Sequence, residues 1–255
     1  GNVSSCEQTI TIVDDTAPVI ESVPGDITLD CDDLAAAPSL TATDNCDTDV
    51  SLSFSESRVD GDCPNRYTLT RTWTATDDCG NETVETQIIV VEDNEAPVIA
   101  SCPTDITISC GESTDPDVNL SLGKASATDN CGAVTITYSD NATSADCQTF
   151  VRTWLVSDLC GNVTSCTQTI TVTDDVAPSF SGIPGSITVS CSSVPEPATP
   201  TATDNCDISV DVTFTETITD GDCPGEYSIR RTWEATDDCG NRTTRSQVIT
   251  VVDTQ

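Results

Sequence analysis

The polar and apolar residues of the chain alternate with a period of two, most clearly around its three tryptophans. Between residues 67 and 75 threonines alternate with a second set of residues that includes Tyr67, Leu69, Trp73 and Ala75. Successive side chains of a β-strand point to opposite faces of the sheet. A buried aromatic face opposite a threonine face is typical of a central strand in an antiparallel sheet with one solvated side. The pattern therefore predicts a strand that ends in an acidic Cys-Gly-Asn turn.

This strand and its turn occur three times, at residues 71–81, 152–162 and 231–241. The dipeptide Ala-Pro also recurs about every eighty residues, and its prolines are Pro18, Pro97 and Pro178. A period near eighty is longer than a solenoid unit and suits an array of sandwich domains. We therefore expect three domains, which we call repeats 1, 2 and 3, at residues 17–95, 96–176 and 177–255.

Residues 1–16 match residues 161–176 almost residue for residue. They are expected to be the last strand of a preceding, truncated repeat, so that the chain is a segment of a longer secreted polypeptide.

Five strand signals recur in each repeat, and no segment shows a helical period. In repeat 1 they comprise residues 27–31, a strand ending in 42–46, residues 50–54 with alternating apolar positions, the tryptophan strand, and residues 86–91. The predicted fold class is all-β, a tandem array of immunoglobulin-like β-sandwich domains held by disulfides.

The composition indicates the compartment in which these domains occur and the partners they exclude. The chain has 43 acidic and 9 basic residues, for a net charge of -34, which repels nucleic acid and anionic membranes and attracts cations. It has fifteen cysteines but neither histidine nor methionine, which indicates an oxidising, extracellular compartment. No apolar run is long enough to span a membrane, so we expect no direct membrane insertion.

An enzyme is not expected. The chain lacks histidine, and no serine stands in a nucleophile-elbow context. Paired carboxylates alone would suit a glycosidase, but here they recur in every repeat, whereas catalysis needs a single site.

The motifs of repeat 2 resemble a known family. Its order is Ser101-Cys102-Pro103 early, Asp129-Asn130-Cys131-Gly132 in the middle, and Gly161-Asn162 before Cys166 late. This order is similar to the hyalin (HYR) repeat, an immunoglobulin-like extracellular module associated with adhesion. The denser cysteines, with Arg-Thr-Trp and Asp-Asp-Cys-Gly-Asn, resemble tandem repeats of giant cell-surface adhesins of Bacteroidota, including SprB-type gliding adhesins. Repeats 1 and 3 depart from the pattern, with Val23 and Ile183 in place of Cys102.

Sandwich topology predicts the disulfides. Four cysteines recur per repeat and allow three pairings. An immunoglobulin-like sandwich has seven strands. The turns after its second and sixth strands share one end, and the turns after its first and fifth strands share the opposite end. We therefore expect bridges within each repeat and Cys6 unpaired. The predicted bridges are Cys31–Cys63, Cys46–Cys79, Cys102–Cys166, Cys110–Cys147, Cys131–Cys160, Cys191–Cys223 and Cys206–Cys239. A zinc site is the alternative, but no CxxC spacing occurs.

Acidic pairs are expected to gather at one end of each repeat, joined by acids of the incoming linker. Clustered carboxylate and amide oxygens suit calcium, which takes six to eight oxygen ligands. The candidate ligands are Asp14, Asp15, Asp44, Asn45, Asp77 and Asp78; Asp93, Asn94, Asp129, Asn130 and Asp158; and Asp174, Asp175, Asp204, Asn205, Asp237 and Asp238. The layout is similar to cadherin junctions. Alternatively, these residues are only good turn formers on a soluble acidic surface.

The tryptophans are expected in the core rather than on a sugar-binding surface, since a sandwich core needs one such residue. Arg71, Arg152 and Arg231 share the face of the tryptophan two positions later. They are expected either to stack on the indole or to pair with an acid that the sequence does not identify.

Two functions fit these features. The first is a structural stalk or spacer in a secreted adhesin filament, rigidified by calcium, which supports adhesion or gliding at the cell surface. In this reading neighbouring repeats are the direct partners, and other parts of a longer chain contact surface glycans or proteins. The alternative is a binding module in which the repeats themselves contact glycan or protein. Near-identical repeats favour the spacer, whereas exposed aromatic residues would favour binding.

Overall fold

The computed structural model describes residues 1, 3–141, 147–222 and 225–253, and its regular structure is almost entirely β. Repeat 1 contains six strands: β1 (Val19–Glu21), β2 (Ile27–Asp30), β3 (Thr41–Thr43), β4 (Ser51–Asp60), β5 (Tyr67–Thr76) and β6 (Glu82–Glu92). The all-β fold class is confirmed. The tryptophan strand is β5, and the predicted strand at residues 86–91 lies inside the longer β6.

The same order of strands returns in the other repeats. Repeat 2 has β7 (Val98–Ser101), β8 (Ile106–Ser109), the short 3-10 helix η1 (Leu120–Leu122), β9 (Ser126–Thr128), β10 (Thr135–Asp140), β11 (Thr149–Ser157) and β12 (Val163–Thr173). Repeat 3 has β13 (Ser179–Ser181), β14 (Ile187–Ser190), β15 (Thr201–Thr203), β16 (Asp211–Asp220), β17 (Tyr227–Thr236) and β18 (Arg242–Val252).

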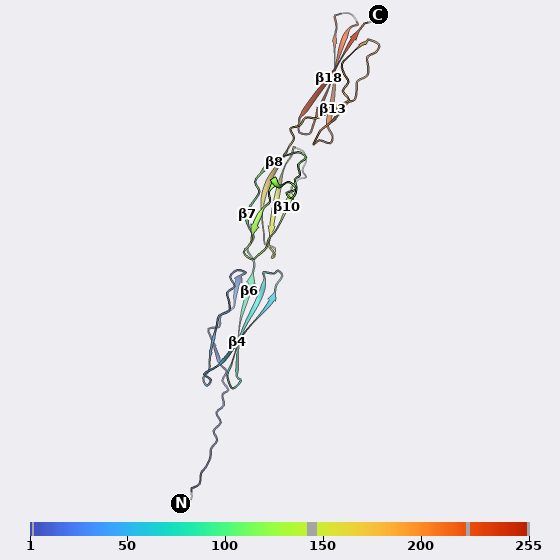
Figure 1. Ribbon diagram of the computed structural model, residues 1–255. Helices are drawn as coiled ribbons and strands as arrows, with labels where there is room; N and C mark the ends of the chain where they lie inside the picture. Colours follow the sequence, from blue (N-terminus) through green and yellow to red (C-terminus); the bar gives the residue numbers. More distant parts are fainter. Residues whose placement is uncertain (2, 142–146, 223–224, 254–255) are drawn as a thin grey trace. The chain divides into compact units, whose positions relative to one another are not determined.

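Each repeat contains one sheet of two strands and one of four (Figure 1). In repeat 1, β1 pairs with β3 in antiparallel fashion, and the larger sheet has the order β2-β6-β5-β4. Its strand β2 runs parallel to β6, with Ile27 opposite Ile89 and Asp30 opposite Glu92. The equivalent parallel pairs are β8 with β12 and β14 with β18. The two sheets form a β-sandwich.

The chain divides into two compact units. The first holds residues 1–100, 127–136 and 155–164, and the second holds the remainder. Each unit therefore contains one complete outer repeat together with the part of repeat 2 that adjoins it.

The tryptophans lie in the sandwich cores, as the alternation predicted. The exposed fractions of Trp73, Trp154 and Trp233 are 2%, 3% and 1%. Along β5 every second residue from Leu69 to Ala75 is buried, and the threonines between them are half-buried. The period of two in the sequence thus decides which side chains enter the core.

Two parts of the chain differ from the expectation. The short strand that follows each Ala-Pro was not predicted; in repeat 1 it is β1, which pairs with β3. Residues 3–13, expected to be a last strand, belong to no strand of the described structure. Their Ile10, Ile12 and Val13 are 76%, 89% and 75% exposed. A strand needs hydrogen-bonding neighbours, and the described residues provide none for this segment.

Candidate functional site

Five disulfides are formed by the described residues, and four of them join consecutive repeats. Cys31 bonds Cys131 and Cys63 bonds Cys160, with Cα–Cα distances of 5.7 and 5.1 Å. Both bridges lie within the first compact unit. The second unit repeats the arrangement with Cys110–Cys206 and Cys147–Cys239. Two covalent bonds therefore hold each junction between repeats.

The expected bridges within single repeats are a wrong prediction, except for Cys102–Cys166, which forms as predicted. The bridges Cys31–Cys63, Cys110–Cys147, Cys131–Cys160 and Cys206–Cys239 are absent because each cysteine bonds a neighbouring repeat instead. The physical reason is that the end of repeat 1 with Cys31 and Cys63 adjoins the end of repeat 2 with Cys131 and Cys160. Each sulfur therefore meets a partner across the junction.

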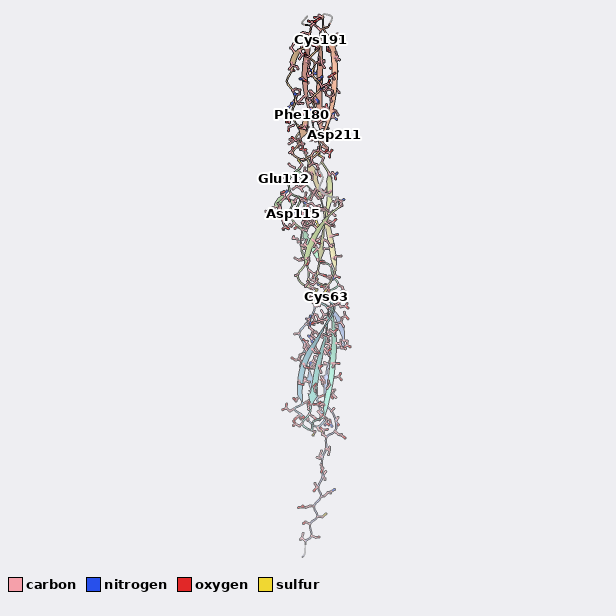
Figure 2. All side chains as sticks on the ribbon, turned by 90° about the vertical axis from the view of Figure 1, so that its right-hand side faces the viewer. Cys63, Glu112, Asp115, Phe180, Cys191 and Asp211 are labelled. Carbon is pink, nitrogen blue, oxygen red and sulfur yellow. A yellow bond between two sulfur atoms is a disulfide. The ribbon has the colours of Figure 1, made fainter. Side chains whose placement is uncertain are left out.

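Four described cysteines are free and exposed, namely Cys6, Cys46, Cys79 and Cys191. The predicted Cys46–Cys79 bridge is therefore not formed. Cys191 lies at the opposite end of repeat 3 from Phe180 and Asp211 (Figure 2). Its predicted partner, Cys223, lies outside the described residues.

Non-reducing peptide mapping checks the pairing. We expect the peptide with Cys63 to be joined to the peptide with Cys160, and the peptide with Cys31 to the one with Cys131. Recovery of Cys31 joined to Cys63 would contradict the structure. Each pair formed in the structure contains one cysteine from each of two repeats, so the two outcomes give different peptide masses.

Three clusters of acidic residues lie near the cysteine turns, two of them beside the bridges and one beside the free Cys46 and Cys79. One oxygen of each of Asp14, Asp44 and Asp77 lies within 4.8 Å of the others, and Asp174, Asp204 and Asp237 form the equivalent cluster. At the junction between repeats 1 and 2, Asp93 and Asp129 approach each other in the same way, but the third member of that group is the sulfur of the bridged Cys131. There the side chain of Asn162 donates to Asp93 Oδ1 at 3.3 Å and to Asp158 Oδ2 at 2.7 Å. The structure thus brings linker acids and turn acids together.

Only the first acidic residue of each predicted pair enters a cluster. Asp77, Asp93, Asp158, Asp174 and Asp237 are buried, and Asp14, Asp44, Asp129 and Asp204 are half-buried. The second members are exposed: Asp15, Asn45, Asp78, Asn94, Asn130, Asp175, Asn205 and Asp238. Several of these bond elsewhere; for example, Asn130 donates to Asp30 and Asn94 to Glu92.

The turns that lead into Cys46, Cys131 and Cys206 orient these first carboxylates. Asp44 Oδ1 accepts from the backbone N–H of Cys46 at 2.8 Å, and Asp129 Oδ1 accepts from that of Cys131 at 2.9 Å. The other oxygen of each, Oδ2, is buried without a hydrogen-bond partner among the described residues. Asp204 repeats this geometry, and Oδ2 of Asp174 is also unpartnered. A buried carboxylate oxygen without a partner is costly, so each cluster offers oxygens that suit a cation.

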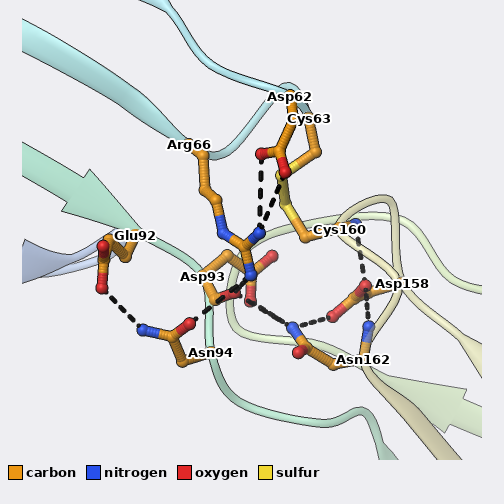
Figure 3. Close-up of polar contacts among 9 residues, drawn as sticks. All are labelled: Asp62, Cys63, Arg66, Glu92, Asp93, Asn94, Asp158, Cys160 and Asn162. Carbon is orange, nitrogen blue, oxygen red and sulfur yellow. Dashed lines mark hydrogen bonds and ion pairs between the residues drawn. A yellow bond between two sulfur atoms is a disulfide. The ribbon is translucent and has the colours of Figure 1, made fainter.

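The asparagine of each Cys-Gly-Asn turn was predicted only as a turn former, yet it also binds the linker. Asn162 Nδ2 donates to the backbone carbonyl of Asp93 at 3.1 Å (Figure 3). Asn81 and Asn241 donate in the same way to the carbonyls of Asp14 and Asp174. The sequence signal is the invariable asparagine at this position in all three turns. Because it contacts both linker and turn, it fixes the direction from which the preceding domain arrives.

At the junction between repeats 1 and 2, the pKa values of Asp158 and Asp93 are shifted in opposite directions. Burial alone would raise the pKa of Asp158, but hydrogen bonds from Asn162, Cys160 and Gly161 outweigh it and lower that pKa. The pKa of Asp93 is raised, first by burial and then by the charges of Asp158, Asp129 and Asp30. The side chain of Asn65 donates to Asp93 and only partly opposes this. No ion pair with the Asp93 carboxylate is present among the described residues.

Arg66 is a second residue at this junction that sequence reasoning missed. Its guanidinium lies 3.3 Å from Asp62 Oδ2 and donates to the backbone carbonyl of Asp93 at 3.3 Å (Figure 3). It does not form an ion pair with the Asp93 carboxylate among the described contacts, so it positions the linker backbone without neutralising the acid.

The arginines of the Arg-Thr-Trp motifs pair with acids on the adjacent strand, and Arg152 also lies over the indole of Trp154, 5.9 Å from the ring centre, so both expected contacts occur there. Arg152 Nε lies 2.8 Å from Asp140 Oδ1, and its Nη2 donates to the carbonyl of Thr114 at 2.6 Å. Its guanidinium also stacks on the ring of Tyr138, 4.2 Å from the ring centre. Arg71 and Arg231 pair with Glu56 and Glu216 at 2.9 and 2.8 Å. These residues hold each sandwich together and are not part of the junction.

Comparison with known proteins gives one family and several structural neighbours. A family model described as "HYR-like domain with 4 cysteines" matches residues 19–91 and 180–251. No curated protein matches the chain.

The structural neighbours include cadherin, protocadherin and immunoglobulin domains. N-cadherin EC1-3 of Drosophila aligns with a TM-score of 0.34 and 15% identity over 91% of this chain and 99% of that one. The protocadherin GammaB4 extracellular domain aligns with a TM-score of 0.33 and 13% identity over 94% of this chain and 51% of that one. Immunoglobulin domains 1–5 of Sidekick-1 align with a TM-score of 0.34 and 13% identity over 93% and 59%. The chain thus spans about half the length of the protocadherin.

Proposed function

Because this chain belongs to the family of HYR-like domains with four cysteines, we propose that it is a non-enzymatic spacer in an extracellular adhesin. In this role the repeats hold an adhesive part of a longer protein away from a cell surface. A Bacteroidota surface adhesin, including the gliding type, is the setting we infer from the motifs. No helix of the described residues is long and apolar enough to cross a membrane.

The observation that carries this proposal is the pair of disulfides at each junction. A single bridge would leave two domains free to rotate about one bond, whereas the bridges Cys31–Cys131 and Cys63–Cys160 fix two points of contact. A spacer needs such restraint, because tandem domains otherwise move relative to one another. A strand of ten residues such as β5 spans about 33 Å, so each repeat adds a length of that order.

Small-angle scattering tests the spacer. The oxidised chain should give one narrow distribution of interatomic distances. The longest distance in it should not change with salt. Selective reduction of the junction disulfides should broaden this distribution while the far-ultraviolet circular dichroism stays unchanged. A distribution that is equally broad before and after reduction would contradict the proposal.

We propose further that each acidic cluster holds a calcium ion. The residues present fit the ion, since each cluster supplies carboxylates, and Asp44, Asp129, Asp174 and Asp204 each offer a buried, unpartnered oxygen. Calcium takes such hard oxygen ligands in flexible geometry, whereas magnesium dehydrates reluctantly. The ion would bind the linker acid to two turns of the next repeat and so stabilise the junction.

Calcium is therefore expected to raise the melting temperature. Extracellular calcium modules bind with Kd of about 10⁻⁴–10⁻³ M. At about 10 mM calcium this adds roughly 1.4–2.7 kcal/mol per site to the free energy of unfolding. Differential scanning calorimetry with calcium, magnesium and chelator measures it. No binding at millimolar calcium, together with unchanged melting, would leave the acids as turn formers only.

Replacing Asp93 with asparagine separates the effect of charge from that of the fold. A raised folded-state pKa means that the stability linked to this group is fully present below the ordinary carboxyl pKa and is lost as pH rises through the raised value. In chelator, the variant should therefore melt higher than the parent near pH 7 and no higher near pH 3. In calcium it should lose the stabilisation of this one junction. Asp49→Asn, at an exposed position outside the clusters, is the control and should change neither.

A second function has one observation in its favour. Each repeat exposes one aromatic residue beside its buried tryptophan: Phe54, Tyr138 and Phe214 are 48%, 40% and 43% exposed. Phe54 and Trp73 line a hollow with residues 37–40, and Phe214 and Trp233 line an equivalent one. Such hollows would suit an apolar group of a glycan or protein partner. Phe54→Ser and Phe214→Ser in an adhesion assay decide between the two: a spacer keeps its adhesion, and a binding module loses it.

A further inference from the structure

We propose that the end of repeat 1 with Cys46 and Cys79 is a covalent docking face for a preceding sandwich domain of the same kind, whose last strand is residues 3–13. The inference rests on free cysteines, an exposed strand segment and a linker contact of this chain. It therefore holds whether the repeats act as a spacer or as a binding module.

The free cysteines stand at positions that are bonded in both other repeats. Cys46 follows Asp-Asn as do Cys131 and Cys206, and those two bond Cys31 and Cys110 of the preceding repeat. Cys79 precedes Gly-Asn as do Cys160 and Cys239, which bond Cys63 and Cys147. Repeat 1 is thus the one repeat whose equivalent pair has no partner within the described residues.

The turns that present these two thiols already have the geometry of a bonded junction. The backbone N–H of Cys79 donates to Asp77 Oδ1 at 2.9 Å, and that of Cys160 donates to Asp158 Oδ1 at 2.8 Å. Around Cys46 the corresponding distance is 2.8 Å, against 2.9 Å around Cys131. A preceding domain would therefore meet a preformed face.

Residues 3–13 carry the side chains of a last strand without the sheet that would bury them. Ile10 and Ile12 are 76% and 89% exposed, whereas their equivalents in β12, Ile170 and Val172, are 0% and 5% exposed. In repeat 2 these two residues lie opposite Ile106 and Ile108 of the parallel strand β8. An element that would bury them is therefore a sandwich with a strand equivalent to β8.

The linker contact shows that this segment reaches repeat 1 as a true last strand does. Asn81 Nδ2 donates to the backbone carbonyl of Asp14 at 3.3 Å. Asn162 and Asn241 make the same bond to Asp93 and Asp174, the residues that follow β6 and β12. A domain that ends in residues 3–13 would thus be delivered to the side of Cys46 and Cys79.

The bonds that form are disulfides between two domains of one polypeptide. Cys46 would join the cysteine equivalent to Cys110, Cys79 the one equivalent to Cys147, and Cys6 the one equivalent to Cys102. In each case two thiols give up two protons and two electrons to a small-molecule disulfide, which is reduced to two thiols. The third bridge follows because Cys6 is equivalent to Cys166, which bonds Cys102.

The test adds such a domain in front of the whole chain. A second copy of residues 96–160 is placed before Gly1, so that it lacks its own last strand and only residues 1–13 can supply one. After refolding in reduced and oxidised glutathione, peptide mapping should find Cys46 joined to the sequence around Cys110 and Cys79 to that around Cys147. Amide exchange of Ile12 should slow by at least about a hundredfold relative to the original chain.

Two double variants separate the role of the strand from that of the bridges. With Cys46→Ser and Cys79→Ser, the extended chain should keep the slow exchange of Ile12 and the bridge of Cys6 to the added copy. With Ile10→Asp and Ile12→Asp, it should lose the slow exchange, and Cys46 should stay open to alkylation.

Three results would overturn the proposal. One is a Cys46–Cys79 bridge in the original or the extended chain. Another is Cys46 joined to Cys191 of a second molecule in the extended chain, since the docked domain would then not be the one that ends in residues 3–13. The last is an added copy that stays unfolded, with a solvent-accessible tryptophan, because residues 1–13 would then have failed to complete it.

Discussion

Replacing Trp154 with alanine is expected to lower the free energy of unfolding by about 3–5 kcal/mol, as large aromatic truncations in cores do. The indole is 3% exposed, and its ring lies 5.4 Å from that of Tyr138. Its removal leaves a cavity in the middle of β11 that the surrounding strands fill only in part. Urea denaturation followed by circular dichroism measures the change.

Two variants control this experiment. Leu155→Ala changes the next residue of β11, which is 44% exposed on the other face, and should cost far less. Trp154→Phe keeps an aromatic ring and removes an indole N–H that is buried without a hydrogen-bond partner among the described residues. It should therefore cost less than the alanine variant, because the lost volume is offset by removing an unsatisfied donor. If Trp154→Ala costs no more than Leu155→Ala, the indole is not the centre of the core.

Replacing Arg152 with alanine should cost about 3 kcal/mol, at the lower end of the range for breaking a buried ion pair. The arginine side chain is 1% exposed, and it contacts both oxygens of Asp140 at 2.8 Å. Its removal leaves that carboxylate unpaired and the carbonyl of Thr114 without its donor. Asp140 is 23% exposed, and the partial solvation keeps the cost from being larger.

Arg58→Ala is the matched control, because its partner Asp60 and the arginine itself are 75% and 45% exposed. An exposed pair of this kind contributes at most about 1 kcal/mol. Arg152→Lys keeps the charge but not the fork that contacts both carboxylate oxygens, so its cost should lie between the two. Equal stability of the Arg152→Ala and Arg58→Ala variants would contradict a structural role for the buried pair.

The long strands could be predicted from the sequence, and the short ones could not. Alternation over ten residues identifies β5, since the buried positions from Leu69 to Ala75 are distinct from the threonines. The strand β1 has only three residues, Val19–Glu21, and one apolar alternation is too little to mark a strand. Its existence depends on pairing with β3, a contact between residues more than twenty positions apart.

The disulfides show a different limit of prediction from the sequence. Topology placed Cys31 and Cys63 together at one end of a sandwich and Cys131 and Cys160 at one end of the next, and the bridges are consistent with that placement. In nearly identical repeats, however, a cysteine has the same kind of partner within its own domain and across the junction. Only the contact between domains decides which bond forms.

The positions of the acidic clusters could be predicted from the sequence, but the residues that form them could not. Asp-Asn and Asp-Asp pairs mark the turns, and the structure does bring Asp14 to Asp44 and Asp77. The sequence does not say which member of a pair faces inward. That is decided by the first aspartate, whose carboxylate accepts a backbone N–H two residues later, as Asp44 does from Cys46.

The path of the covalent bonds has a consequence for a chain under tension. Force applied to its two ends passes from Cys31 directly to Cys131, then through the backbone to Cys147 and from there to Cys239. Of the backbone between Cys31 and Cys239, only residues 131–147 lie on this shortest route. Within repeat 1 the load passes along β2 (Ile27–Asp30) and leaves at Cys31, so that its parallel neighbour β6 lies off the loaded path. Stretching the oxidised chain would therefore break contacts while releasing little contour length, and a reducing agent would turn the same domains into extensible ones.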